Sequence, residues 1–213
     1  MISPLRPRIL KGGFIHYDEQ SPDGNFIIFQ YNPGRIFRRL EAREKRFWNW
    51  LKIFHLSSSI SPRETIIFTI VLDAADYLED PETYPGVVES GIYPQLSALE
   101  MLLYPQSSPA KNNSSLALKW PLSPREQPLT LFTWGKKRVI PVKVTELRIH
   151  EEMFDPLLNP IRATVKVTMQ VLNGTDLRWG HKGYDYWVAH VSTKTAMAKV
   201  GQANRSVSHL DKI

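Results

Sequence analysis

The alternation of apolar and polar residues near the start of the chain predicts a β-hairpin. Residues 11–17 and 25–31 are rich in β-branched and aromatic residues, and a Ser-Pro-Asp-Gly segment precedes the second run. Proline followed by Asp-Gly favours a tight turn between two strands. In the second run Phe26 and Ile28 lie on one face, and the other face is equally apolar. This pattern predicts a strand that is buried on both faces.

Four further runs have the period of two that is typical of strands. Residues 64–74 alternate strictly, with β-branched residues on one face and large apolar residues on the other. Later in the chain, a Gly-Lys-Lys segment joins residues 129–134 to residues 138–152 as a tight hairpin link. The last strand is expected over residues 161–172. The two longest of these strands are long enough to wrap a barrel or to project from one.

Two helices are predicted by apolar residues at helical spacing. The first covers residues 92–104, where leucines recur, and the second covers residues 184–200. Between the strands, the acidic segment 73–91 predicts an exposed connection. Residues 105–128 are rich in proline, serine and asparagine and predict a surface loop, while the polar residues 201–213 predict a flexible tail.

These elements predict a mainly β (α+β) fold, a β-barrel or sandwich with one or two flanking helices. Hydrophobic residues make up 42% and charged residues 23% of the chain, which is typical of a globular protein. We therefore expect one domain over residues 1–200, with an inserted basic helical arm at 35–60. We expect neither an export signal nor membrane insertion, because no apolar run approaches the roughly 18 to 20 residues of a spanning helix.

Much of the net charge of +6 lies in the arm at 35–60. Phe47, Trp50 and Phe54 recur at helical spacing, which predicts a basic amphipathic helix. Such a helix docks on its own domain, on a protein partner or on a membrane surface. The candidate partner-binding residues are Arg35, Arg38, Arg39, Arg43, Trp48 and Trp50.

Nucleic-acid binding is the alternative from another class. Small β-barrels bind single strands with basic grooves and stacking aromatic side chains, and the arm contains both residue types. The aromatic residues lie on a predicted helix, however, and not at exposed strand positions, so we expect no nucleic-acid partner.

Little in the sequence predicts an enzyme, and we expect no catalytic residue, no metal site and no cofactor. The chain has no cysteine, and its six histidines show no i, i+4 pair that could hold a metal on a helix. Acidic pairs such as Glu151-Glu152 are commoner as solvated surface than as the two carboxyl groups of a glycosidase. Phosphate-binding and dinucleotide-binding motifs are absent from the sequence.

Four phrases occur in a fixed order along the chain. They are a Lys-Gly-Gly leading into Ile-Ile-Phe-Gln-Tyr-Asn-Pro at 27–33, residues 64–76, residues 91–100, and Phe-Asp-Pro-Leu-Leu-Asn-Pro-Ile-Arg-Ala at 154–163. In this order they resemble the tube-type protein family of contractile, phage-tail-like injection systems. Each Asn-Pro pair is expected to terminate a strand, because proline lacks an amide donor. These strand-terminating residues are Asn32, Pro33, Asn159 and Pro160.

The resemblance implies a tail-tube-like β-barrel or sandwich and a structural role. It implies a homo-oligomer, a six-membered ring, that acts as an adaptor joining the inner tube to the spike or baseplate hub. Tube subunits, the spike or hub protein and baseplate proteins are the implied partners, with no small-molecule substrate. The main inner tube subunit is the alternative within the family. The implied location is the cytoplasm, within a phage-tail-like particle.

Many members of this family carry a C-terminal LysM peptidoglycan-binding domain. These 213 residues contain none, which favours a minimal tube or adaptor subunit. The basic arm and the proline-rich loop favour the adaptor, since both offer layer-specific contacts.

Overall fold

One antiparallel β-sheet forms the body of the protein. The structure, a computed structural model, describes residues 10–17, 24–42, 61–79, 82–104, 128–177 and 179–203. Within these ranges the sheet has the strand order β2-β1-β5-β6-β7-β4-β3. In chain order the elements are β1 (Gly13–Tyr17), β2 (Asn25–Ile28), β3 (Ile36–Glu41), β4 (Arg63–Asp73), α1 (Ala75–Leu78), α2 (Pro85–Ser90), α3 (Tyr93–Glu100), β5 (Leu129–Thr133), β6 (Val139–Phe154), β7 (Pro160–Val171) and α4 (Lys182–Ala203).

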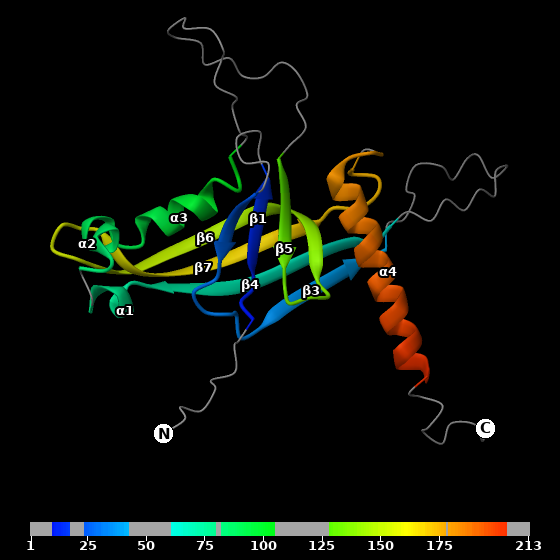
Figure 1. The fold of residues 1–213 in the computed structure, drawn as a ribbon, viewed down its shortest axis with the longest axis horizontal. Coiled ribbons are helices and arrows are strands. Elements are labelled where there is room, and N and C mark those ends of the chain that lie inside the picture. Colours follow the sequence, from blue (N-terminus) through cyan, green and yellow to red (C-terminus); the bar gives the residue numbers. More distant parts are fainter. Residues whose placement is uncertain are drawn as a thin grey trace, which may run out of the picture.

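The sheet curls around its own core. Phe14 of β1 stacks on Phe68 of β4 with 6.3 Å between ring centroids, and Phe132 of β5 stacks on Phe68 at 5.3 Å. Because β6 and β7 lie between these strands in the sheet, such contacts require the two ends of the sheet to face each other. Figure 1 shows β1, β2 and β5 crossing in front of β6, β7 and β4. The buried aromatic and aliphatic side chains fill the space between them.

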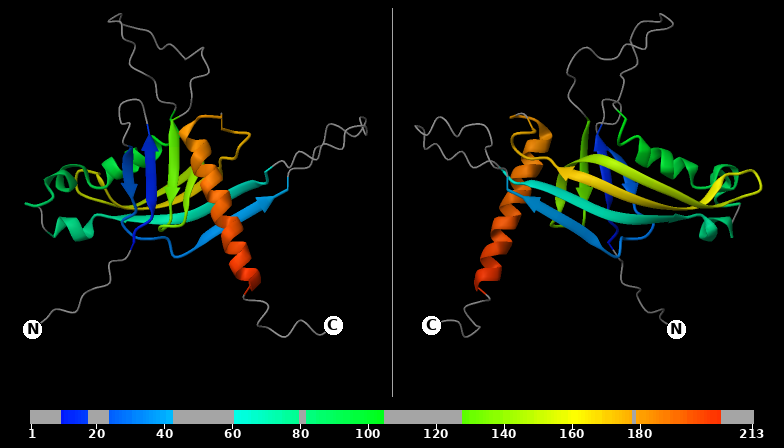
Figure 2. Two further views of the ribbon diagram at one scale, coloured as in Figure 1. Left: turned by 45° about the vertical axis from the view of Figure 1, so that its right-hand side comes forward. Right: turned by 180° about the vertical axis from the view of Figure 1, so that it is seen from behind.

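The helices lie at opposite ends of the sheet. Figures 1 and 2 show α1, α2 and α3 at one end, beside the turn that joins β6 to β7, and α4 at the other end. Helix α3 buries Leu96 and Leu99 in the core. None of the helices in the described ranges is long and apolar enough to cross a membrane.

Most of the predicted elements are confirmed. The hairpin of β1 and β2, the strand β4 and the three strands β5, β6 and β7 lie where the alternating pattern placed them. Helices α3 and α4 occupy the two stretches with helical spacing. The mainly β, α+β class is confirmed as well, as a single curled sheet with helices.

Two predictions about local structure are wrong. β2 is an edge strand, so Phe26 and Ile28 stay 64% and 65% exposed instead of being buried. The first part of the expected helical arm is the strand β3, because pairing with β4 outweighs the weak helical pattern of residues 36–41. Residues 43–60 of the arm lie outside the described residues, as do most of the loop at 105–128 and the end of the tail.

Smaller corrections concern boundaries. The expected connection at 73–91 contains the two short helices α1 and α2. Helix α4 continues through Ala203, beyond the expected start of the flexible tail. Pro160 starts β7 and ends no strand, which agrees with the tolerance for proline at the first position of a strand.

Candidate assembly surfaces

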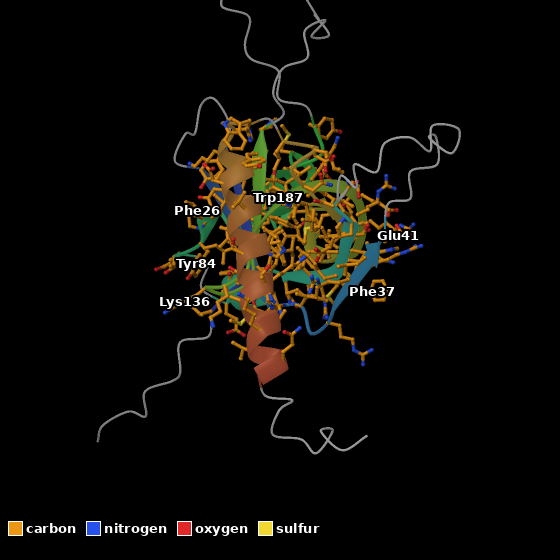
Figure 3. All side chains as sticks on the ribbon, turned by 90° about the vertical axis from the view of Figure 1, so that its right-hand side faces the viewer. Phe26, Phe37, Glu41, Tyr84, Lys136 and Trp187 are labelled. Atoms are coloured by element: carbon orange, nitrogen blue, oxygen red, sulfur yellow. The ribbon has the colours of Figure 1, made fainter. Side chains whose placement is uncertain are left out.

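β3 forms one open edge of the sheet, and among the described strands it pairs only with β4. Its residues Phe37 and Leu40 are exposed, and Arg39 forms an ion pair with Glu41 at 2.6 Å. Figure 3 shows Phe37 and Glu41 on β3, beside α4 and pointing away from the sheet. Unpaired strand edges with exposed apolar side chains are surfaces that proteins otherwise cover or charge. The β3 edge therefore combines exposed apolar side chains with the charged side chains of Arg38, Arg39 and Glu41.

A buried carboxylate ties this edge to α4. Glu64 of β4 is 4% exposed; its Oε1 accepts a hydrogen bond from Arg38 Nε at 2.8 Å, and its Oε2 accepts one from Lys194 Nζ. Burial by itself raises the pKa of Glu64, but the hydrogen bonds from Lys194 and Arg38 outweigh it and hold the pKa below its usual value. The carboxylate therefore stays charged and clamps three elements together.

His190 of α4 lies beside this clamp. It is 7% exposed, and its Nε2 has no hydrogen-bond partner among the described residues. Burial, together with the positive charge of Lys194, lowers the pKa of His190 to about 4. The imidazole is therefore neutral at pH 7 and acts as a packing residue under the helix.

The second half of α4 extends beyond the sheet. The first half is anchored, since Trp187 packs over Gly174 and Lys194 reaches Glu64. From Thr195 to Gln202 every residue is exposed, including Met197 and Val200. Figure 2 shows this end of α4 projecting away from the strands. An isolated helix of this length is marginal in water, so a packing partner would stabilise this part of α4.

The turn between β6 and β7 is a rigid apolar tip. Asp155 Oδ1 accepts hydrogen bonds from the main-chain N–H groups of Leu157 and Asn159, both at 2.8 Å, and Oδ2 accepts one from Asn159 Nδ2 at 2.9 Å. A second bond from Asn159 Nδ2 reaches the carbonyl of Glu89 at 3.0 Å and fixes the turn to α2. The hydrogen bonds from Asn159 are the largest influence on Asp155 and lower its pKa, so it stays ionised.

This turn holds two leucines in solvent. Leu157 and Leu158 are 78% and 79% exposed. Leu158 has φ of 66°, and it is the one non-glycine residue with positive φ in the described part of the chain. A leucine in this region costs about 1 kcal/mol or more, and such strain is typical of functional positions. The tip thus presents apolar side chains in a fixed arrangement.

In the segment 27–33, two amide side chains each form a pair of hydrogen bonds to the main chain of another segment, and we call this arrangement the clasp. The Gln30 side chain donates to the carbonyl of Asp73 at 2.6 Å and accepts from its N–H at 2.8 Å. Asn32 accepts from the N–H of Gly12 at 2.8 Å and donates to the carbonyl of Leu10 at 2.9 Å. The two amide side chains therefore join the end of β2 to β4 and to the start of β1.

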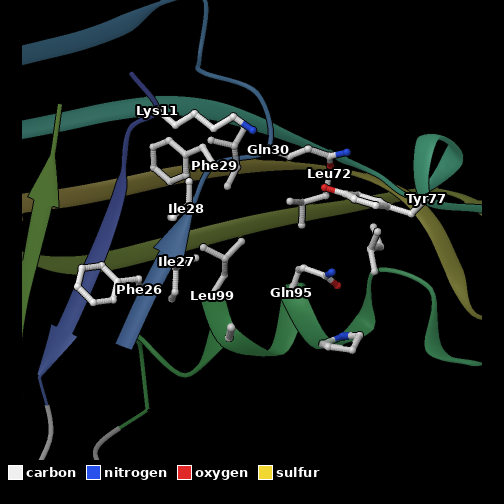
Figure 4. Close-up of a pocket in the computed structure, with 14 residues that line it drawn as sticks. Lys11, Phe26, Ile27, Ile28, Phe29, Gln30, Leu72, Tyr77, Gln95 and Leu99 are labelled. Atoms are coloured by element: carbon white, nitrogen blue, oxygen red, sulfur yellow. The ribbon is translucent and has the colours of Figure 1, made fainter. Parts of the chain in front are cut away.

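A groove lies on the far side of β2 from β1. It has a volume of about 440 Å³ and is lined by residues of β2, β4, α1 and α3. Figure 4 shows Phe26, Ile28 and Leu99 on one part of its wall and Leu72 and Tyr77 on another. Its lining is mostly apolar, and Lys11 supplies the only charge among the residues that line it.

The predicted partner-binding residues are only partly brought together. Arg38 and Arg39 lie on β3, where each is ion-paired, and Arg35 lies exposed just before this strand. Arg43, Trp48 and Trp50 are outside the described residues. Of the strand-terminating residues, Asn32 and Asn159 each form hydrogen bonds that fix a turn, which their sequence alone did not indicate.

Sequence reasoning missed the clamp that Glu64 forms with Arg38 and Lys194, and it missed His190 beside this clamp. Glu64 and Lys194 lie 130 positions apart, and neither belongs to a motif. The described residues contain no group of three acidic or histidine side chains that could hold a metal ion.

Comparison with known proteins does not assign the chain to a family. No protein-family model matches the chain, and no curated protein matches it.

Proposed function

We propose that the protein is a ring-forming structural subunit of a contractile injection system, an adaptor that joins the inner tube to the spike or baseplate hub. The observation that carries the proposal is a set of three apolar projections on one small sheet. These are the β3 edge, the free half of α4 and the tip between β6 and β7. A monomer rarely leaves so many apolar side chains exposed at separate protruding places, whereas a subunit of an assembly covers them with its neighbours.

A closed ring requires two different surfaces on each subunit, because identical subunits meet head to tail. The projections differ in chemistry, as such contacts require. The β3 edge carries Arg35, Arg38 and Arg39 against Glu41, whereas the tip is uncharged at Leu157 and Leu158. The clamp at Glu64 supports the role by fixing α4 against β3, so that both surfaces keep one relative geometry.

The adaptor is favoured over the main tube subunit by the variety of these surfaces. A tube subunit stacks on copies of itself, whereas an adaptor meets different proteins above and below. The resemblance of the four phrases implies six copies in a ring. In this role the protein transmits ring geometry mechanically and catalyses no reaction, and it acts within a particle that is assembled in the cytoplasm.

Electron microscopy of the full chain, mixed with the proteins encoded beside it, tests the proposal. We expect rings that cap a spike complex once. Rings that stack without limit would make the protein the main tube subunit. A persistent monomer that retards single-stranded DNA would replace the proposal with nucleic-acid binding.

The double variant Leu157→Asp and Leu158→Asp adds a sharper version of this test. It places two charges on the tip and is expected to abolish ring or spike contacts while the sheet stays folded, because both side chains are already in solvent. The control is Lys136→Asp, at the exposed turn between β5 and β6. Equal assembly of both variants would remove the tip from the interface.

A further inference from the structure

The free edge of β2 opens into the apolar groove. Phe26 and Ile28 line this groove, and so do Ala98 and Leu99 of α3. No described strand pairs with β2 on this side. Figure 4 shows β1 on one side of β2 and the groove with α3 on the other.

The register of the hairpin determines which main-chain groups face the groove. Phe29 N–H donates to the carbonyl of Gly12 at 3.0 Å, and Phe14 lies opposite Ile27. In an antiparallel ladder every second residue bonds to the same neighbour, so Ile27 also points its main chain toward β1. The N–H and C=O groups of Phe26 and Ile28 therefore point away from β1, toward the groove.

These groups define the kind of ligand that fits. An extended peptide segment can pair with Phe26 and Ile28 through its own main chain and place alternate side chains against the apolar wall. The wall includes Leu72 and Leu99, so apolar side chains are preferred. Lys11, the only charge among the lining residues, favours an acidic residue on the segment.

The β3 edge of a second copy fits this site less well. Around β3 the chain carries Arg35, Arg38 and Arg39 against Glu41, so its excess positive charge would meet Lys11. The groove is also walled by α3 on one side and by Leu72 and Tyr77 on the other, which leaves room for one segment rather than the edge of a whole sheet (Figure 4).

We propose that the groove between β2 and α3 binds an extended, apolar segment of another protein, which adds to β2 as a strand and places an acidic side chain beside Lys11. The site does not depend on ring formation, since it uses none of the three apolar projections. Its partner is a different protein chain that contributes a single strand.

Selection of a random dodecapeptide phage-display library on the full-length chain tests the proposal. We expect enriched peptides with apolar residues at alternate positions and one Asp or Glu. Their binding is expected to be lost in Ile28→Pro, which removes an N–H that faces the groove and leaves the bonds to β1 intact. Failure to enrich any peptide that Ile28→Pro rejects would overturn the proposal.

Exchanging the charges of Lys11 and the peptide tests whether Lys11 selects an acidic side chain. Lys11→Glu is expected to weaken the best acidic peptide about three- to tenfold and to bind its Lys-substituted version better. The matched control, Lys136→Glu, lies on a distant turn and should leave both affinities unchanged. Loss of affinity in both variants, or no exchange in preference, would contradict the role of Lys11.

Two further measurements separate strand addition from other modes of binding. In an extended peptide, every second N–H group points toward β2. N-methylation of these N–H groups should abolish binding, whereas N-methylation of the other N–H groups should not. Equal binding of all methylated peptides would refute main-chain pairing. Because the chain has no cysteine, a mixture of Gln95→Cys and Arg39→Cys chains reports on the second copy. A disulfide between the two chains would show that the groove holds β3 of a neighbour and would overturn the proposal.

Discussion

Replacing His190 should remove a defined part of the pH dependence of stability. The folded protein holds the pKa of His190 at about 4, against an ordinary value of 6.5. Because one pKa unit corresponds to about 1.4 kcal/mol, neutral burial of His190 opposes protonation by about 3 kcal/mol. The charged groups that face it are Lys194, Glu64, Arg38 and Arg138.

The sign follows from which state binds the proton. Between pH 6.5 and pH 4 the unfolded chain protonates His190 and the folded chain does not, so protonation favours unfolding in this window. The stability of the fold with neutral His190 is therefore undiminished above pH 6.5, and it decreases as the pH falls toward 4. Glu64 contributes at lower pH, because its stabilisation is present above the ordinary pKa of a Glu and is lost as the pH falls from there through its own lowered pKa.

Urea unfolding at pH 7.5 and pH 4.5 measures the effect. The wild-type free energy of unfolding should fall by about 2.5 kcal/mol through His190, and His190→Leu should lack this part of the decrease. His150→Leu is the matched control, because His150 is exposed on β6, and it should retain the wild-type dependence. The reasoning would be refuted if the free energy of unfolding of His190→Leu fell with pH as much as that of the wild type, or if the NMR titration midpoint of His190 lay above pH 6.

Three other substitutions test the local contacts. Gln30→Ala should destabilise the protein by about 1–3 kcal/mol in urea unfolding, because two main-chain groups lose their partners; an unchanged midpoint would argue against the clasp. Gly91→Ala places a Cβ 2.1 Å from a carbonyl at φ of 58° and should lower the free energy of unfolding by more than about 1 kcal/mol, whereas Gly86→Ala, with no atom within 4 Å, should change little. Asp155→Ala should speed thermolysin cleavage at the apolar tip several-fold, and equal rates would show that its hydrogen bonds do not hold the turn.

The strands were predictable because their patterns depend on local order alone. Residues 64–74 alternate so regularly that β4 could be placed to within one residue. The position of a strand in the sheet depends instead on distant partners. The sequence of β2 predicts a buried strand because three of its four residues are apolar, yet β2 lies at the edge of the sheet, where Phe26 and Ile28 are exposed.

The candidate surfaces were predictable only in part, for the same reason. The excess of arginine near residue 35 drew attention to this stretch, but its conformation depends on pairing with β4. Asn32 and Asn159 stood out by their Asn-Pro context, although their role lies in side-chain hydrogen bonds. Glu64 was indistinguishable from any surface glutamate until α4 was placed beside it.

The strand order has a consequence for how the chain folds during synthesis. β1 lies beside β5, and His16 contacts Thr130 from 114 positions away. β4 likewise pairs with β7, the last strand to be made. Closing such long loops slows folding, because the entropy of the intervening chain is lost before the contacts form. β1 and β4 thus lack their sheet neighbours β5 and β7 on the nascent chain until residues near 171 have left the ribosome, so the sheet closes around its core only after most of the chain has been translated.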